Sequence, residues 1–346
     1  MPLGHLLKRT LVVPLRVPGI ANVLASLTHT QASIFMLHRF SSPADGVRGH
    51  DAATIGAILS YLRRTRYDLI SVQELFRRLR EDEPLKRAVA FTIDDGYFDH
   101  GLVGGPIFAK FDCPVTIFAV TGFLDGKIWL WWDQIQYVCE ATSRTTLKAT
   151  VGNEERSYTL DSAQARLSAA HDISFWCQDA PHPDREACIS NLSLDAEVEV
   201  PQTSPRQFAP LSWDEARRLE KRGGVTFGPH SVTHPVLSST DEEHARSEIS
   251  TSWRRICEEL ASPVPVFCYP HGRQRDFGPR EMELVRLAGL WGAVQAYPGR
   301  LCVDQFREAP AICRVPRYPI GKGLMDVLQC ISGFQVLKNR LQGAIA

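Results

Sequence analysis

The chain has 346 residues, and 39 lysine and arginine residues balance 39 aspartate and glutamate residues. A hydrophobic share of 44% and a charged share of 23% exclude an intrinsically disordered chain, which combines low hydrophobicity with high net charge. The balanced charge also lacks the basic excess typical of nucleic-acid-binding proteins, so we expect no nucleic-acid partner.

The cysteines and the two ends of the chain indicate a cellular location. Nine scattered cysteines without a CxxC pair argue against a disulfide framework, and we expect most of them to be reduced and buried. Basic and proline residues interrupt the apolar runs of the N-terminal extension (1–30), so neither a signal peptide nor a membrane span is predicted. We therefore expect a cytoplasmic protein. The extension and the C-terminal tail (321–346) each favour a short basic amphipathic helix, which either packs on the domain or contacts a membrane surface.

Short apolar runs alternate with helical patterns along most of the chain. In chain order, strands are expected at 33–37, 69–71, 87–93, 115–120, 224–227, 265–269 and 291–296. Helices are expected at 53–66, 72–80, 106–111, 215–222, 242–260 and 280–288. This alternation predicts a parallel α/β fold, and the number of units favours a barrel at least as much as an open sheet.

The alternation fails between residues 139 and 210. Residues 146–160 predict a hairpin around Gly152 and Asn153, whereas the polar sequences PHPDREAC and PQTSPRQ predict loops. We interpret the segment as an insertion in a barrel of residues 31–320, with a separate small domain as the alternative.

Two adjacent carboxylates, Asp94 and Asp95, end the expected strand 87–93 and precede Gly96. Burying charged groups is costly unless something uses them, and active sites of parallel α/β folds lie at this end of the strands. The alternative is an ordinary turn, which aspartate and glycine also favour.

Two histidines, His230 and His234, follow the expected strand 224–227 in the sequence GPHSVTHP. On a helical turn, their spacing would put both imidazoles on one side, where they can share a metal, although the spacing alone arises readily by chance. Because Pro235 ends such a turn at once, we expect a loop or a single turn here. The sequence lacks the glutamate of an HExxH metalloprotease helix. Together with Asp95, the histidines would provide the ligands of a catalytic zinc site, and Asp94 would remain free as a general base.

The sequence FCYPHG ends the expected strand 265–269 and contains Tyr269, Pro270, His271 and Gly272. Proline and glycine favour an irregular loop whose backbone N–H groups can stabilise an oxyanion. The alternative is an ordinary strand-to-helix turn.

In this order, the motifs TIDDG, GPHSVTH and FCYPHG resemble those of the polysaccharide deacetylase family, carbohydrate esterase family 4. The segments SIFMLHR, PIFAKFDCPVTIFAVTG, WLWWD and LSWDE are similar to its poly-N-acetylglucosamine deacetylase branch. The resemblance covers nearly the whole chain. It implies a distorted (β/α)7-type barrel that removes acetyl groups from sugars with Zn2+ or another divalent transition metal.

The resemblance also implies roles for individual residues. Asp94 corresponds to the catalytic base. The implied metal ligands are Asp95, His230 and His234. The implied substrate-groove loop contains Tyr269, Pro270 and Gly272, and the backbone N–H of His271 is its oxyanion donor.

The chain departs from the family pattern in two places. The family's loop often starts with an arginine that braces the base, but Cys268 stands there, so Arg314 or Arg317 is the candidate replacement. The usual late histidine that acts as general acid is missing, so His38 is the candidate, with His271 as competitor.

The predicted catalytic and substrate-contacting residues follow from this resemblance and from the two departures. The catalytic set is Asp94, His38 and His271, and the substrate-contacting set is Tyr97, Tyr269, Pro270, Gly272, Arg317 and Trp132. Trp132 belongs to a tryptophan group that either stacks on sugar rings or packs in the core.

We expect a metal-dependent hydrolase that removes N-acetyl groups from an amino sugar in a polysaccharide or glycoconjugate precursor. The alternatives are a hydrolase of another amide or an O-acetyl ester, and a non-catalytic carbohydrate-binding relative. The neutral chain suits an uncharged acetylated sugar. The sequence gives no indication of the oligomeric state.

Overall fold

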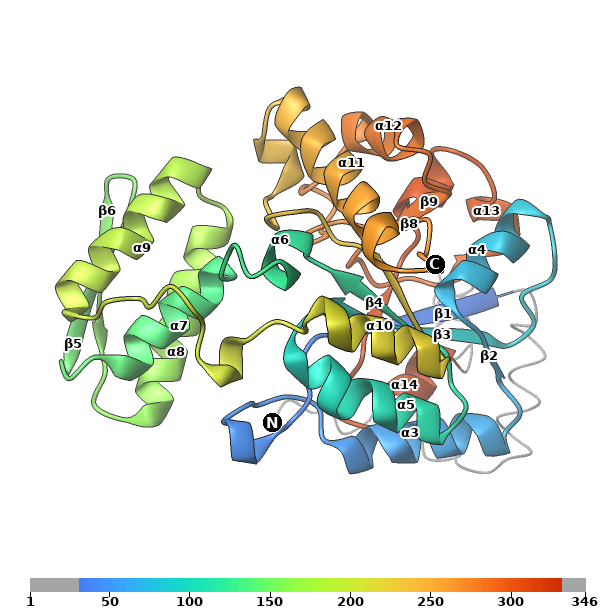
Figure 1. Cartoon of the computed structure of the whole chain (residues 1–346), viewed down its shortest axis with the longest axis horizontal. Coiled ribbons are helices and arrows are strands. Elements are labelled where there is room, and N and C mark those ends of the chain that lie inside the picture. Colours follow the sequence, from blue (N-terminus) through green and yellow to red (C-terminus); the bar gives the residue numbers. More distant parts are fainter. Residues whose placement is uncertain (1–30, 332–346) are drawn as a thin grey trace, which may run out of the picture.

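The computed structural model describes residues 31–331 (Figure 1). The expected N-terminal extension and the part of the C-terminal tail after residue 331 lie outside the described residues. Within residues 31–331, no helix has the length and apolar character needed to cross a bilayer.

The strands and helices that the sequence predicts occur close to their expected positions, and further elements lie between them. The strands are β1 (Gln31–Leu37), β2 (Asp68–Leu69), β3 (Ala88–Asp95), β4 (Val115–Ala119), β5 (Thr146–Val151), β6 (Glu154–Thr159), β7 (Val225–Pro229), β8 (Val266–Cys268), β9 (Gly292–Val294), β10 (Leu301–Cys302) and β11 (Tyr318–Pro319). The helices are α3 (Ala52–Arg64), α4 (Val72–Arg80), α5 (Gly105–Lys110), α6 (Thr121–Leu124), α7 (Trp131–Ala141), α8 (Ala163–Gln178), α9 (His182–Ala196), α10 (Trp213–Arg222), α11 (Glu242–Glu259), α12 (Pro279–Leu287), α13 (Val303–Phe306) and α14 (Leu324–Ile331).

The strands of the main body form a ring. β1, β3, β4 and β7 pair side by side and parallel. Next to β7, the Val264 N–H donates to the Phe227 carbonyl at 2.7 Å, and β8 pairs in parallel with β9. Val294 of β9 bridges Val315, and β11 pairs in parallel with β1, so the ring returns to its first strand. This confirms the predicted α/β fold with a distorted (β/α)7-type barrel.

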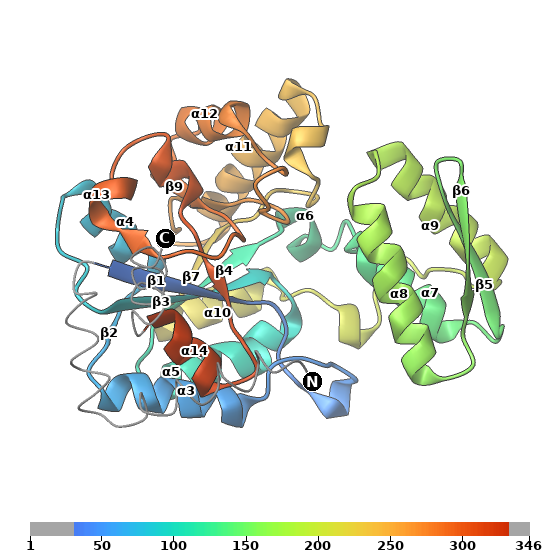
Figure 2. The same cartoon turned by 180° about the vertical axis from the view of Figure 1, so that it is seen from behind.

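Helices cover the ring from outside (Figures 1 and 2). Helices α3, α5, α10 and α14 contribute to one apolar cluster, and α4, α11 and α12 contribute to another. The helices begin where the sequence supplies polar caps: Asp51 accepts a hydrogen bond from Thr54 N before α3, and Ser212 forms a capping box with Glu215 at α10. Helix α14, the described part of the expected tail, buries Val327, Leu328 and Ile331 in the first cluster.

A separate layer stands beside the barrel (Figure 1). It consists of α7, the β5–β6 hairpin, α8 and α9, which enclose a small apolar core of their own. This core begins at Trp131, ahead of the expected boundary at residue 139, because α7 buries Trp131, Ile135 and Val138 in it.

The expected loop at PHPDREAC is wrong, because this sequence begins α9. Pro181 occupies the N-cap and Pro183 lies in the first turn. The N–H groups of a first turn have no partner within the helix, so proline is tolerated there.

Candidate active site

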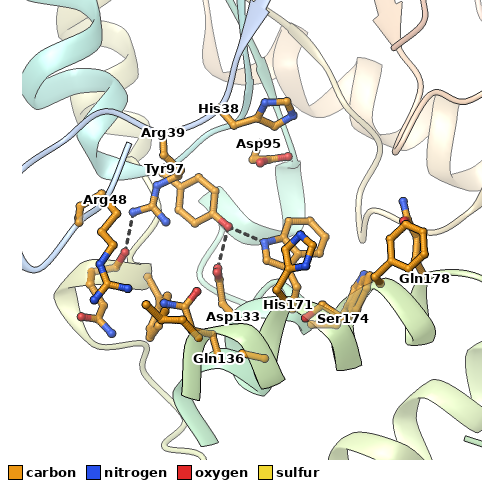
Figure 3. Close-up of a pocket in the computed structure, with 18 of the residues that line it drawn as sticks. His38, Arg39, Arg48, Asp95, Tyr97, Asp133, Gln136, His171, Ser174 and Gln178 are labelled. Carbon is orange, nitrogen blue, oxygen red and sulfur yellow. Dashed lines mark hydrogen bonds between the residues drawn. The ribbon is translucent and has the colours of Figure 1, made fainter. Parts of the chain in front are cut away.

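The predicted site residues meet at the carboxyl ends of the barrel strands. Asp94 and Asp95 end β3, whereas His38 and His230 directly follow β1 and β7. Parallel strands bring these ends together. A pocket of about 1430 Å³ lies there, lined by both the barrel and the insertion (Figure 3).

Asp95, His230 and His234 form a compact, buried ligand group. Their nearest ligand atoms lie within 4.8 Å of one another, and Asp95 Oδ1 is 3.6 Å from His230 Nε2 and 3.7 Å from His234 Nε2. Zinc–ligand bonds of about 2.1 Å in a tetrahedron separate neighbouring ligand atoms by roughly 3.4 Å, so the three atoms fit one ion. His230 Nδ1 donates to the Cys268 carbonyl at 2.8 Å, which leaves its Nε2 lone pair for a metal.

The charges in this group also fit a cation. Burial lowers the pKa of His230 to about 4 and that of His234 well below its ordinary value. Both rings are therefore neutral and can offer a nitrogen lone pair to a metal. Burial raises the pKa of Asp95 to about 7, against the opposing effect of His38 and with a further rise from the charge of Asp94. A divalent cation would supply the positive charge that this buried carboxylate lacks.

Several residues of these motifs have positive φ angles, which are unusual for side chains with a Cβ atom. The angles are 84° at Asp95, 66° at Ser231, 59° at His234 and 58° at His271. Such conformations persist where the surrounding structure holds them, and they cluster at functional sites.

Contacts from other elements hold the loop between His230 and His234. The buried Glu248 of α11 accepts hydrogen bonds from the backbone N–H groups of Val232 at 2.7 Å and Thr233 at 2.9 Å. The backbone of Gly122 lies so close that a Cβ atom there would stand 2.6 Å from the Val232 carbonyl oxygen. These contacts fix where His230 and His234 point.

Asp94 forms a buried, two-pronged ion pair with Arg317. Arg317 Nη1 and Nη2 donate to Asp94 Oδ1 and Oδ2, each at 2.7 Å, and Nη1 also donates to Thr92 Oγ1 at 2.9 Å. Burial raises the pKa of Asp94, but the charge and hydrogen bonds of Arg317 outweigh this and hold the pKa below its ordinary range. Asp94 is therefore ionised, and Arg317 rather than the exposed Arg314 braces it.

His38 reaches the pocket from the end of β1. Its side chain is 49% exposed, and its Nε2 lies 4.0 Å from Asp94 Oδ2. The buried Asp99 holds the segment behind it, because it accepts from Arg39 Nε at 3.0 Å and from the Phe40 N–H at 2.6 Å.

His271 is tied to the insertion. Gln178 Nε2 at the end of α8 lies 2.7 Å from His271 Nδ1. Because an amide nitrogen only donates, Nδ1 accepts, and the neutral ring carries its proton on Nε2. Burial lowers the pKa of His271 to about 3, with a further contribution from Arg273. Next to Gln178, Asp179 accepts from Arg273 at 2.9 Å and from Arg275 at 2.6 Å.

The predicted substrate-contacting residues fall into two groups. Tyr97, Trp132 and Tyr269 line the pocket, and the Tyr97 hydroxyl donates to Asp133 Oδ2 at 2.8 Å (Figure 3). Trp132 Nε1 donates to the same hydroxyl at 2.9 Å.

Pro270, Gly272 and Arg317 are buried and do not line this pocket. Gly272 shapes the loop instead, because its φ is 67° and a Cβ atom there would lie 2.6 Å from the Ala296 nitrogen. The Arg317 guanidinium lies against Asp94 and Thr92, which engage it, and does not line the pocket itself.

Sequence reasoning missed Glu248, Gln178 and Asp99. Each contacts a site residue or its neighbours across a large separation along the chain. A lone polar residue in a helical or strand-to-helix segment carries no local signal of such a contact, so no pattern in the sequence could have identified them.

Comparisons with known proteins agree with this geometry. Residues 184–284 match the model of the polysaccharide deacetylase family, a segment that includes His230, His234 and His271 but not Asp94 or Asp95. No curated protein sequence matches the chain at a significant level.

Solved structures share the fold. The deacetylase PplD from Streptococcus pyogenes, in complex with acetate, is 16% identical with a TM-score of 0.56, over 87% of this chain and 98% of that one. IcaB from Ammonifex degensii is 14% identical with a TM-score of 0.54, over 88% and 97%. A de-N-acetylase from Aggregatibacter actinomycetemcomitans is 13% identical with a TM-score of 0.51, over 84% and 95%. Residues 184–284 are thus similar to the polysaccharide deacetylase family, and the chain shares the fold of the solved deacetylases.

Proposed function

We propose that this protein is a metal-dependent hydrolase that removes N-acetyl groups from an amino sugar in a polysaccharide or glycoconjugate precursor. The observation that carries the proposal is the buried Asp95–His230–His234 group beside a separate, ionised Asp94 in one pocket. The family match and the names of PplD and the de-N-acetylase support the same reaction class.

The residues divide the work of amide hydrolysis. Asp95, His230 and His234 would hold a divalent cation such as Zn2+, which would supply Lewis-acid activation of water and of the acetamide carbonyl. Asp94, kept ionised by Arg317, accepts a proton from the attacking water. His38 donates a proton to the leaving nitrogen as the C–N bond breaks, which yields acetate and the free amino sugar. The backbone N–H of His271 faces the developing oxyanion.

Metal removal tests the proposal directly. We expect chelation to abolish acetate release from N-acetylglucosamine oligomers, and Zn2+ to restore it, because the proposed hydrolysis depends on Lewis-acid activation by the cation. Elemental analysis should find about one metal ion per chain. A metal-free protein with full turnover would contradict the proposal, and a metal-bound protein that cleaves only O-acetyl esters or cyclic amides would favour another hydrolase.

Substitution of His38 distinguishes the two candidate acids. We expect His38→Gln to lower kcat by about 10²–10⁴-fold with little change in KM, because a general acid acts on the transition state. His182→Gln, at an exposed histidine of the insertion, is the matched control. If His38→Gln kept wild-type kcat while His271→Gln lost it, His271 would be the acid.

A further inference from the structure

The insertion presents an exposed aromatic ring to the pocket. The side chain of Phe175 on α8 is 61% exposed and lines the same pocket as Asp94 and His234. An exposed phenylalanine forgoes the favourable free energy that burial of its ring would contribute. A ring left exposed inside a concave site, rather than on a convex surface, points to a ligand.

Helix α8 has two different faces. Ala169, Ala170, Ile173 and Cys177 are buried in the core of the insertion. His171, Ser174, Phe175 and Gln178 recur at helical spacing and line the pocket. Figure 3 shows His171, Ser174 and Gln178 on this helix, with His38 and Asp95 at another wall of the pocket.

The chemistry of the pocket face suits an uncharged sugar. An apolar ring is flanked by an imidazole, a hydroxyl and an amide, and none of the four residues carries a carboxylate. The carboxylate of the neighbouring Asp172 is engaged by the Tyr158 hydroxyl at 2.7 Å and by Arg156 at 3.6 Å. A sugar has the same two kinds of surface, because its ring face is apolar and hydroxyl groups surround its edge.

Helix α8 is held in place relative to the catalytic loop. Gln178 contacts His271, and Asp179 pairs with Arg273 and Arg275 at the end of the same helix. The Phe175 ring stands one helical turn before this anchor. Its position relative to the metal-ligand group is therefore set before a ligand binds, which reduces the entropic cost of binding.

The size of the pocket leaves room for a second ring. Pockets that hold a single drug-sized molecule occupy about 300–1,000 Å³. The pocket between barrel and insertion, at about 1430 Å³, exceeds that range. This volume accommodates a second ring beside an acetylated sugar placed near Asp94.

We propose that His171, Ser174 and Phe175 form a carbohydrate subsite that stacks on a sugar ring next to the acetylated one. This inference rests on the proposed function, because the acetylated sugar defines which ring is its neighbour. It gives the insertion a role: the enzyme selects glycans of two or more rings over single sugars.

Substitution of Phe175 tests the subsite with N-acetylglucosamine and its oligomers of two to five rings. We expect Phe175→Ala to lower kcat/KM for the oligomers roughly threefold to tenfold, mainly through KM, and to leave the single sugar unchanged within about twofold. Phe175→Trp should keep the preference for oligomers over the single sugar, because it retains an aromatic face. Leu194→Ala is the matched control, since Leu194 lies on α9 of the insertion, is 76% exposed and does not line the pocket.

The outcomes separate this proposal from the proposed function. If Phe175→Ala lowered kcat/KM equally for the single sugar and the oligomers, or did not lower it for the oligomers, the proposed subsite would be wrong. Calorimetric titration of the oligomers into the Asp94→Asn protein, with and without Phe175→Ala, measures binding without hydrolysis. Oligomer binding that depends on Phe175 supports the subsite even if the wild type hydrolyses no acetamide. Absence of binding, or binding independent of Phe175, overturns it.

Discussion

The Asp94→Asn variant should lose about 10²–10⁴-fold in kcat for acetate release and still bind its metal ion. Asparagine keeps the shape of the side chain but cannot accept a proton from water at neutral pH. The three proposed metal ligands Asp95, His230 and His234 remain unaltered, so metal content by elemental analysis should match the wild type. Retained metal with lost turnover would separate the role of the base from the role of the cation.

A matched substitution controls for a general loss of negative charge in the pocket. Asp172 also lines the pocket, but its carboxylate accepts from the Tyr158 hydroxyl and does not contact Asp94 or the metal-ligand group. We expect Asp172→Asn to stay within a few-fold of wild-type kcat. Near wild-type turnover of Asp94→Asn would show that another group is the base, and loss of metal from that variant would show that Asp94 helps to hold the ion.

The barrel could be predicted because its strands leave a strong signal. Strands of a parallel sheet are buried on both faces, so they appear in sequence as short apolar runs, and the run at 87–93 became β3. The helix predicted at 72–80 is α4 (Val72–Arg80), whose buried face recurs at helical spacing.

The insertion gave a weaker signal because its core is small. Helix α8 buries Ala169, Ala170, Ile173 and Cys177 while Phe175 stays exposed, so apolar residues lie on more than one side. The apolar residues of α8 therefore show little helical periodicity. In α9, the prolines suggest a loop, although they stand at the beginning of the helix. Two helices were therefore missed in a segment whose hairpin was located correctly.

The active site was predictable where residues follow strand ends, and unpredictable where they meet through tertiary contacts. Asp95 and His230 come together because parallel strands share an end, which the order of elements already indicates. The choice between Arg314 and Arg317 depended on the local backbone, which the sequence does not reveal. Arg314 ends a short 3-10 helix (Ala311–Arg314) and is exposed, whereas Arg317 is buried and pairs with Asp94.

The buried ion pair between Arg317 and Asp94 predicts the largest change in stability. We expect Arg317→Met to lower the free energy of unfolding by about 3–5 kcal/mol, because Asp94 would remain buried without a partner for its charge. Urea unfolding followed by circular dichroism measures the change. Turnover should fall as well, because the pKa of Asp94 would rise once burial is no longer opposed by the guanidinium.

A double substitution distinguishes loss of the pair from simple loss of packing. In Asp94→Asn/Arg317→Met, no buried charge remains at this place, so the double variant should be more stable than Arg317→Met alone. Arg317→Lys should be intermediate in stability, since it keeps the charge but loses the two-pronged geometry. If the double variant were as unstable as the sum of both single variants, the two side chains would contribute independently. Arg317 would then stabilise the barrel through its contacts with Thr92 and the Gln295 carbonyl rather than through the charge of the base.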